Sequence, residues 1–152
     1  MPSKALAVNK RATFDYEVID TIEAGLELLG TEVKSVKHGN IALKGSFVTI
    51  HDEQAWLTNA TIPPWQIKNA PPNYDPQRTR RLLIKKSELK SLIGSKQAQG
   101  LTIIPLRVYT KRGRIKLEVA LARGKKRHQK KEQKREQDIK RDVDRLLRGK
   151  DI

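Results

Sequence analysis

The stretch LTIIPLRVYTKRGRIKLEVALA, residues 101–122, decides the fold class of this chain of 152 residues. Its second half alternates between apolar residues and polar or small ones, the apolar set being Ile115, Leu117, Val119 and Leu121. Alternation with a period of two residues is typical of a strand with one buried face. The turn residues Lys111-Arg112-Gly113 separate this strand from the apolar run 101–110, so the stretch predicts a β-hairpin.

Shorter runs of the same kind precede this hairpin. Residues 14–28 alternate in the same way, with a break near Asp20 that predicts two strands or one bent strand. Residues 46–50 and 55–60 are β-like and are joined by a polar loop of four residues, the pattern of a second hairpin. We expect Trp56 in this hairpin to lie in the core.

Two segments carry helix signals. One predicted helix begins with Thr31 as its cap and ends at Gly39, and another begins with Ser87 and ends at Gly94. About six short strands with two to three short helices, in about 120 residues, predict a mainly β fold. An OB-like antiparallel barrel, closed or nearly closed, is the expected architecture, and a β-sandwich fits the same pattern.

A proline-rich segment separates the two halves of the predicted barrel. Residues 62–76 contain five prolines, so we expect a long surface loop. Trp65 and Tyr74 lie in this loop. Their rings can stack on unpaired bases or fold back and seal the barrel, and the sequence leaves both alternatives open.

The last thirty residues differ in character from the rest. Residues 1–122 form the predicted barrel, and residues 123–152 form a tail with 13 basic and 6 acidic residues. The tail has too few apolar residues to build a core, but Ile139, Val143, Leu146 and Leu147 share one face if it becomes helical. We expect the tail to be disordered alone and helical when bound.

The charge of the whole chain points to a polyanionic partner. The chain carries a net charge of +15, with a pI near 10.2, and has no apolar run long enough to span a membrane. It has no cysteine, and its first residues lack the features of a secretion signal, so we expect a cytoplasmic protein. Nucleic acid is therefore the expected partner, and a membrane is not.

No pattern in the sequence indicates catalysis. The three histidines, His38, His51 and His128, have no second ligand at a metal-like spacing, and we expect neither a metal nor a cofactor. Neither a nucleophile signature nor a glycine-rich phosphate loop is present, so we expect an RNA-binding protein and not an enzyme. The rival functions are a ribosomal or assembly protein that holds ribosomal RNA and an RNA-processing enzyme.

Several short strings, taken in order, carry a resemblance to a known family. They are Asn9-Lys10-Arg11-Ala12, Tyr16, Glu23-Ala24-Gly25, the segment GTEVKS at 30–35, Asn59-Ala60, the segment DPQRTRRLL at 75–83, Pro105-Leu106 and Gly124-Lys125-Lys126. Each string is weak alone, but their order and spacing are specific. Together they make the chain resemble the small protein B family, the SsrA-binding proteins of bacterial trans-translation.

The resemblance implies a function in ribosome rescue. It implies an OB-type barrel that binds the tRNA-like domain of transfer-messenger RNA and delivers this RNA to stalled ribosomes. It also implies a tail that becomes helical in the decoding centre and the empty mRNA channel of the small ribosomal subunit. We expect the protein to act as a monomer.

The resemblance also assigns roles to individual residues. Glu23, Leu83 and Lys116 match the family's RNA-contacting set, and Gly124-Lys125-Lys126 match its junction between domain and tail. The full set of expected RNA contacts is Asn9, Lys10, Arg11, Glu23, Lys34, Arg78, Arg80, Arg81, Leu83, Lys116, Gly124, Lys125 and Lys126. The expected ribosome contacts in the tail are Lys130, Lys131, Lys134, Arg135, Ile139, Lys140, Arg141, Val143 and Leu146.

Two of these assignments raise a chemical question. A carboxylate beside RNA is repulsive unless it accepts a hydrogen bond from a base amine or a 2′-hydroxyl, or fixes a neighbouring lysine. For Glu23 we favour the direct acceptor role. In the tail the family usually has Asp-Lys-Arg where this chain has Gln129-Lys130-Lys131, so the acidic first position is lost here.

Overall fold

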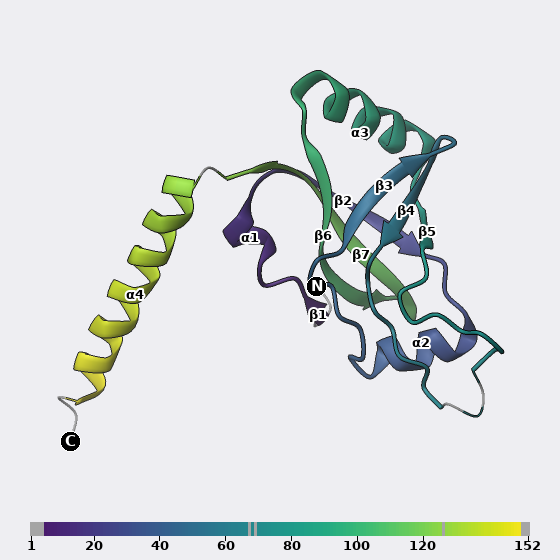
Figure 1. Ribbon diagram of the computed structural model, residues 1–152, viewed down its shortest axis with the longest axis horizontal. Coiled ribbons are helices and arrows are strands. Elements are labelled where there is room, and N and C mark those ends of the chain that lie inside the picture. Colours follow the sequence, from purple (N-terminus) through teal and green to yellow (C-terminus); the bar gives the residue numbers. More distant parts are fainter. Residues whose placement is uncertain (1–4, 67, 69, 126, 150–152) are drawn as a thin grey trace.

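The computed structural model describes residues 5–66, 68, 70–125 and 127–149. Within these residues the chain forms seven strands and four α-helices (Figure 1). In chain order they are β1 (Ala5–Val8), α1 (Ala12–Asp15), β2 (Tyr16–Leu26), α2 (Gly30–Lys37), β3 (Phe47–His51), β4 (Gln54–Thr58), β5 (Arg80–Leu83), α3 (Lys86–Gln99), β6 (Thr102–Lys111), β7 (Arg114–Gly124) and α4 (Arg127–Gly149).

The strands form one antiparallel sheet in the order β1-β6-β7-β2-β5-β4-β3. The sheet curls so that β3 contacts β6, but the described pairings do not join these two strands into a closed barrel. The predicted mainly β, OB-like fold is confirmed in this nearly closed form. The short strand β1, which sequence reasoning did not predict, pairs with the outer edge of β6.

The decisive hairpin forms as predicted. Strands β6 and β7 are joined by the turn Arg112-Gly113, in which both residues have positive φ, 53° and 76°. Strand β7 pairs with β6 on one side and with β2 on the other, so it lies at the centre of the fold. Its apolar residues, Ile115, Leu117, Val119 and Leu121, belong to the main hydrophobic core.

The second hairpin corrects two expectations. The pairing continues to His51 and Gln54, so the loop has two residues, Asp52-Glu53, instead of four. Both residues adopt positive φ, 51° and 58°, which is the conformation that a two-residue hairpin turn requires. Trp56 is half-buried and not part of the core, because it lies on the face of β4 opposite to the fully buried Leu57.

Helix α2 begins differently from the prediction. Its N-cap is Leu29, whose backbone N–H donates a hydrogen bond to the Glu32 carboxylate at 2.8 Å. The prediction that Thr31 caps the helix is therefore wrong. Its buried hydroxyl has no hydrogen-bond partner within the described part of the chain. The helix ends before Gly39, which has the expected left-handed φ of 81°.

Two further element boundaries differ from the sequence prediction. Helix α3 does not stop at Gly94 but continues to Gln99, where Gly100 takes the left-handed conformation with φ of 62°. Its N-cap is Lys85 and not Ser87, which lies inside the helix. The segment 14–28 forms one strand with an irregular register between Val18 and Asp20, and its first residues belong to α1 instead.

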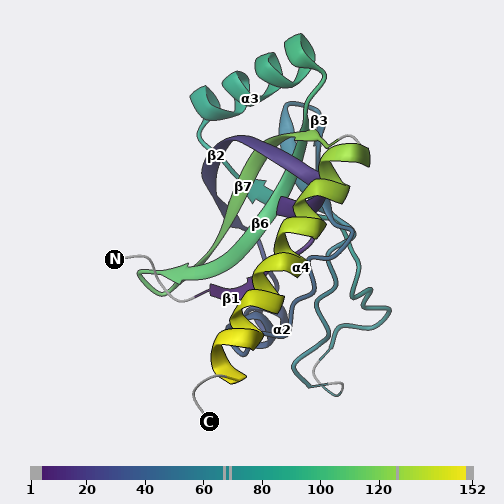
Figure 2. The same ribbon diagram turned by 90° about the vertical axis from the view of Figure 1, so that its left-hand side faces the viewer.

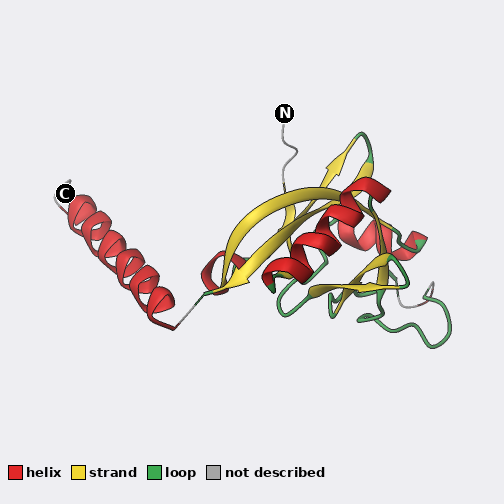
Figure 3. Ribbon diagram, turned by 90° about the horizontal axis from the view of Figure 1, so that it is seen from above, coloured by secondary structure: helices red, strands yellow, loops and turns green. Residues whose placement is uncertain are grey.

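Helix α4 extends away from the sheet (Figures 1 and 3). Near its start it contacts α1, and Lys130 Nζ is 3.4 Å from the Asp15 carboxylate. Figure 2 shows α4 crossing the view in front of the sheet. The backbone N–H of Lys125, just before the helix, donates to Asp15 O at 2.9 Å. The four apolar residues of the predicted stripe are exposed, namely Ile139, Val143, Leu146 and Leu147. That the tail is disordered in the isolated protein stays a prediction.

Candidate nucleic-acid interface

A row of residues crosses four strands on the outer face of the sheet. Tyr109 of β6 is paired with Lys116 of β7, Lys116 with Gly25 of β2, and Gly25 with Leu83 of β5. A Cβ atom on Gly25 would lie 3.2 Å from Cβ of Leu83, so the leucine side chain packs directly over the glycine. Leu83 nevertheless keeps 50% of its surface exposed. The row therefore presents an apolar side chain beside a lysine.

A second row of charged residues runs next to the first and contacts its Tyr109. Arg107 of β6 is paired with Glu118 of β7, and Glu118 with Glu23 of β2. Arg107 Nε lies 3.3 Å from the Glu118 carboxylate, and its guanidinium stands 4.6 Å from the centre of the Tyr109 ring. Sequence reasoning missed Arg107 and Tyr109. Counting residues back from the Arg112-Gly113 turn would have placed Tyr109 opposite the predicted Lys116 and Arg107 two residues further along the same face.

Glu23 is held by neighbours from β6. The Tyr109 hydroxyl donates to Glu23 Oε2, and Lys111 Nζ is 3.5 Å from Glu23 Oε1. The hydrogen bond from Tyr109 lowers the pKa of Glu23 below its usual value, and the nearby Lys111 charge acts in the same direction. Burial, together with the Glu23 charge, raises the pKa of Tyr109, which therefore stays protonated as a donor. One carboxylate oxygen is thus taken by Tyr109, and the other has only a weak lysine contact.

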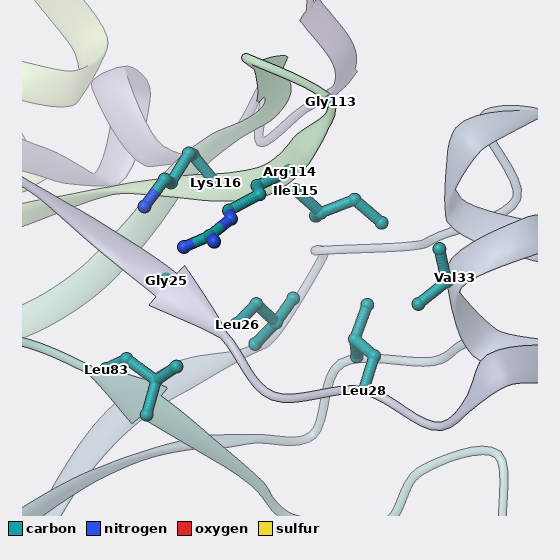
Figure 4. Close-up of a pocket in the computed structure, with 9 residues that line it drawn as sticks. All are labelled: Gly25, Leu26, Leu28, Val33, Leu83, Gly113, Arg114, Ile115 and Lys116. Carbon is teal, nitrogen blue, oxygen red and sulfur yellow. The ribbon is translucent and has the colours of Figure 1, made fainter.

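A pocket of about 460 Å³ lies beside these rows (Figure 4). It is lined by Gly25, Leu26, Leu28, Val33, Leu83, Gly113, Arg114, Ile115 and Lys116. Figure 4 shows the Arg114 and Lys116 side chains reaching from β7 toward Gly25, while Val33 of α2 lies on the far side. An apolar floor with a cationic rim suits a sugar or base whose phosphate meets the rim.

A buried arginine anchors strand β5 on its inward face. Arg80 is fully buried, and its Nε donates to Glu32 of α2 at 2.7 Å. Its other nitrogens donate to the backbone oxygens of Ala60 at 3.0 Å and Pro76 at 2.9 Å. Because the guanidinium is enclosed and satisfied by the protein, Arg80 has no surface to offer to RNA. It instead fixes the strand that carries Leu83.

The same Glu32 carboxylate also binds two residues at the end of the proline-rich segment. The Tyr74 hydroxyl donates to Glu32 Oε2 at 2.8 Å, and Arg78 Nε donates to the same oxygen at 3.1 Å. Burial alone would raise the pKa of Glu32, but the hydrogen bonds from Arg78, the Leu29 N–H, Arg80 and Tyr74 outweigh it and lower the pKa to about 2. Tyr74 therefore folds back and seals the barrel. Arg78 is partly exposed, although its guanidinium is paired with the buried Glu32 carboxylate.

A second group of predicted residues lies around α1. Asn9 precedes this helix and donates through Nδ2 to Pro105 O at 2.9 Å, while Lys10 and Arg11 are exposed. At the end of β7, Lys125 Nζ donates to Thr13 O at 2.7 Å. Gly124 is exposed beside it, and Lys126 lies outside the described residues.

The two groups are well separated. Lys116 and Gly124 lie eight residues apart on the same strand, which corresponds to about 27 Å. Lys34 is exposed on α2, and Arg81 is exposed on β5 with its nearest carboxylate, that of Glu27, 4.0 Å away. The predicted set is thus not one site but two patches, one around Lys116 and Leu83 and one around α1.

The tail residues lie along α4. Lys130 is partly buried, and the other eight expected ribosome contacts are exposed. The exposed contacts are Lys131, Lys134, Arg135, Ile139, Lys140, Arg141, Val143 and Leu146. Lys134 and Arg141 of α4, with Lys10 and Arg11, help to line a hollow of about 470 Å³ between α4 and α1. The basic residues of the tail and those of the second group therefore meet at one cationic surface.

Two features of the described residues bear on other functions. In the described ranges, no three or more His, Asp or Glu side chains are grouped so that they could hold a metal ion. None of the helices described is both long and apolar enough to span a membrane.

Known proteins resemble the chain over most of its length. The family model described as "SmpB protein" matches residues 6–149. The "SsrA-binding protein" of Thermosynechococcus vestitus is 46% identical over 125 residues, 82% of this chain and 82% of that protein. That of Trichodesmium erythraeum is 46% identical over 123 residues, 81% of this chain and 79% of that protein. A chain of the solved structure described as "tmRNA-SmpB: a journey to the center of the bacterial ribosome" is 43% identical with a TM-score of 0.64, covering 83% of this chain and 92% of that chain.

Proposed function

The chain belongs to the SmpB protein family, and from this premise we propose that it binds transfer-messenger RNA and delivers it to stalled ribosomes for trans-translation. It acts in this function as an RNA-binding protein and not as an enzyme. The observation that carries the proposal is the row Lys116–Gly25–Leu83, which holds an exposed leucine beside a cationic pocket on the outer face of the sheet.

The chemistry of this surface fits the tRNA-like domain of that RNA. Such a fold offers phosphates, 2′-hydroxyls and unpaired loop bases, and little base-edge information. Lys116 and Arg114 neutralise phosphates at the rim, and Leu83 packs against a sugar or a base. Glu23 accepts a hydrogen bond from RNA through the oxygen that Tyr109 does not occupy. Arg80 is left out of the contact set because it is enclosed in the protein.

The second group and the tail form the ribosome-facing part in this proposal. Lys10 and Arg11 lie beside α4, whose basic residues suit a channel walled by RNA. Its apolar stripe becomes buried when the tail is bound in the decoding centre and the empty mRNA channel. We further propose that the protein acts as a monomer in the cytoplasm, where stalled ribosomes occur.

Paired binding and stability measurements test the RNA surface. Lys116→Ala and Leu83→Asp change side chains that are partly or half exposed, so the thermal melt should stay close to that of the wild type. Their affinity for a transfer-messenger RNA transcript in a gel shift should fall. Unchanged affinity in both variants would remove this face from the binding surface.

A competition experiment separates the proposal from its main rival. A ribosomal or assembly protein would prefer ribosomal RNA over transfer-messenger RNA. After ribosomes are stripped by high salt, the tagged protein should enrich transfer-messenger RNA over ribosomal RNA in a pull-down. Preferential recovery of ribosomal RNA would favour the rival.

A further inference from the structure

The proline-rich loop divides its two aromatic residues between two environments. Tyr74 turns inward and is fixed by Glu32 and by Ile62 O, both at 2.8 Å. Trp65 stays at the surface with 37% of its area exposed and stacks on His38, with ring centres 4.1 Å apart and an angle of 26° between the planes. Since Tyr74 already closes the barrel, sealing does not explain why a large ring is kept at the surface.

Helix α2 links the stack of Trp65 and His38 to the pocket on the sheet. His38 ends helix α2, and its Nδ1 lies 2.8 Å from Lys34 O in the preceding turn. Val33 of the same helix lines the pocket, and Val33 and His38 are separated by about 7.5 Å along the helix axis. One or two nucleotides span such a distance.

Exposed lysines mark the path between the two places. Lys37 follows Val33 by four residues and so lies on the same face of α2, and Lys34 is related to His38 in the same way. Both lysines are exposed. A cationic strip with aromatic rings at its end is the arrangement by which proteins bind unpaired nucleotides, because every base offers a face for stacking.

We propose that Trp65 and His38 form a platform on which an unpaired base of the bound RNA stacks, after the backbone has crossed Lys37 and Lys34. The proposal rests on the proposed function, because it extends the same RNA surface from the sheet over α2. It assigns the loop a direct role in recognition of an unpaired nucleotide, in addition to its structural role through Tyr74.

Affinity measurements on matched variants test the platform. Trp65→Ala should weaken binding of a transfer-messenger RNA transcript about tenfold, within the range for base stacking, while Trp65→Phe keeps a ring and most of the affinity. Phe47→Ala is the control, because Phe47 is also 37% exposed but lies on β3, away from α2. A fully paired RNA duplex should bind Trp65→Ala and wild type equally. Equal losses of affinity in Trp65→Ala and Trp65→Phe would indicate a structural role for Trp65 and overturn the platform.

Tryptophan fluorescence gives a readout that a structural role would not move. The chain has two tryptophans, so Trp56→Phe leaves Trp65 as the only one. A base stacked on Trp65 should quench its emission as the transcript is added, and Lys34→Gln with Lys37→Gln should shift this quenching to higher RNA concentration. Unquenched emission at saturation, with Lys116→Ala still weakening binding, would reject the platform and leave the proposed function standing. If Trp65 emission is not quenched and Lys116→Ala does not weaken binding, the sheet surface is rejected as the RNA-binding surface as well.

Discussion

The sheet and the C-terminal helix carry nearly equal net charge but hold it in different ways. Residues 1–122 have 19 basic and 11 acidic residues, and residues 123–152 have 13 and 6. In the sheet, Glu32 binds Arg80 in the interior, and Glu23 is held by Tyr109 at the surface. In α4, most charged side chains are exposed, and its apolar stripe is uncovered.

This difference separates a surface that is preformed from one that is completed by its partner. The sheet positions Leu83 and Lys116 before any RNA arrives, so binding there costs little ordering of the protein. A helix with an exposed apolar stripe gains most of its stability when a partner covers that stripe. Charge alone would have predicted the same behaviour for both regions.

The largest expected effect tests how firmly the sheet is fixed. Glu32→Gln leaves the buried Arg80 without a charged partner, and breaking such a pair costs about 3 to 5 kcal/mol of unfolding free energy. Urea denaturation measures the loss. Glu27→Gln is the control, because Glu27 is exposed and only 4.0 Å from Arg81, a pair worth about 0 to 1 kcal/mol. Similar small losses in both variants would mean that the buried cluster does not anchor β5.

Acid should remove the same contribution from the wild-type protein. The pKa of Glu32 is about 2 in the folded state, below its ordinary value of 4.5, so its stabilisation is complete above that ordinary value and disappears as pH falls toward 2. The shift corresponds to about 3 kcal/mol. The difference in stability between wild type and Glu32→Gln should therefore shrink between pH 5 and pH 2.5, measured by denaturation at each pH. A constant difference would contradict the assigned pKa.

On the helix side, the apolar stripe should matter for the ribosome but not for free RNA. Replacing Ile139 and Leu146 with Asp should reduce tagging of stalled chains several-fold, because the stripe can no longer be buried, while every basic residue remains. Replacing the same pair with Asn keeps the net charge and isolates the loss of apolar surface. Full tagging by the Asn variant would show that the stripe is not buried on the ribosome.

The smallest expected effect concerns the geometry of the sheet face. Gly25→Ala places a Cβ 3.2 Å from Cβ of Leu83, so the leucine must shift by a few tenths of an ångström. Affinity for transfer-messenger RNA should fall a few-fold in a gel shift. Gly94→Ala on α3 is the matched control, because nothing lies within 4 Å of its added Cβ. Unaltered binding by Gly25→Ala would mean that the exact position of Leu83 is unimportant.

The strands were predictable because their signal is local. The alternation of Ile115, Leu117 and Val119 identified β7, which pairs with both β6 and β2 and so decides the fold. Helix ends were less predictable. Gly94 and Thr31 carry the residue types of a helix stop and a helix cap, but α3 continues to Gln99, and α2 begins after Leu29, whose N–H donates to Glu32.

The candidate site was predictable in part. Arg80 resembled a surface RNA contact, but it alternates with Arg81 on β5 and shares the inward face of Leu82, which the period of two could have revealed. The role of Glu32 was not predictable, because its partners Tyr74, Arg78 and Arg80 lie more than forty residues away along the chain. Such contacts depend on the tertiary fold and leave no local pattern.

The division between the two regions is tested most directly by removing residues 130–152. The truncated protein keeps every strand of the sheet, so its affinity for transfer-messenger RNA should remain close to that of the full chain. In a reconstituted translation system stalled on a message without a stop codon, it should fail to support tagging. Full tagging by the truncated protein, or a loss of RNA affinity as large as the loss of tagging, would contradict the division.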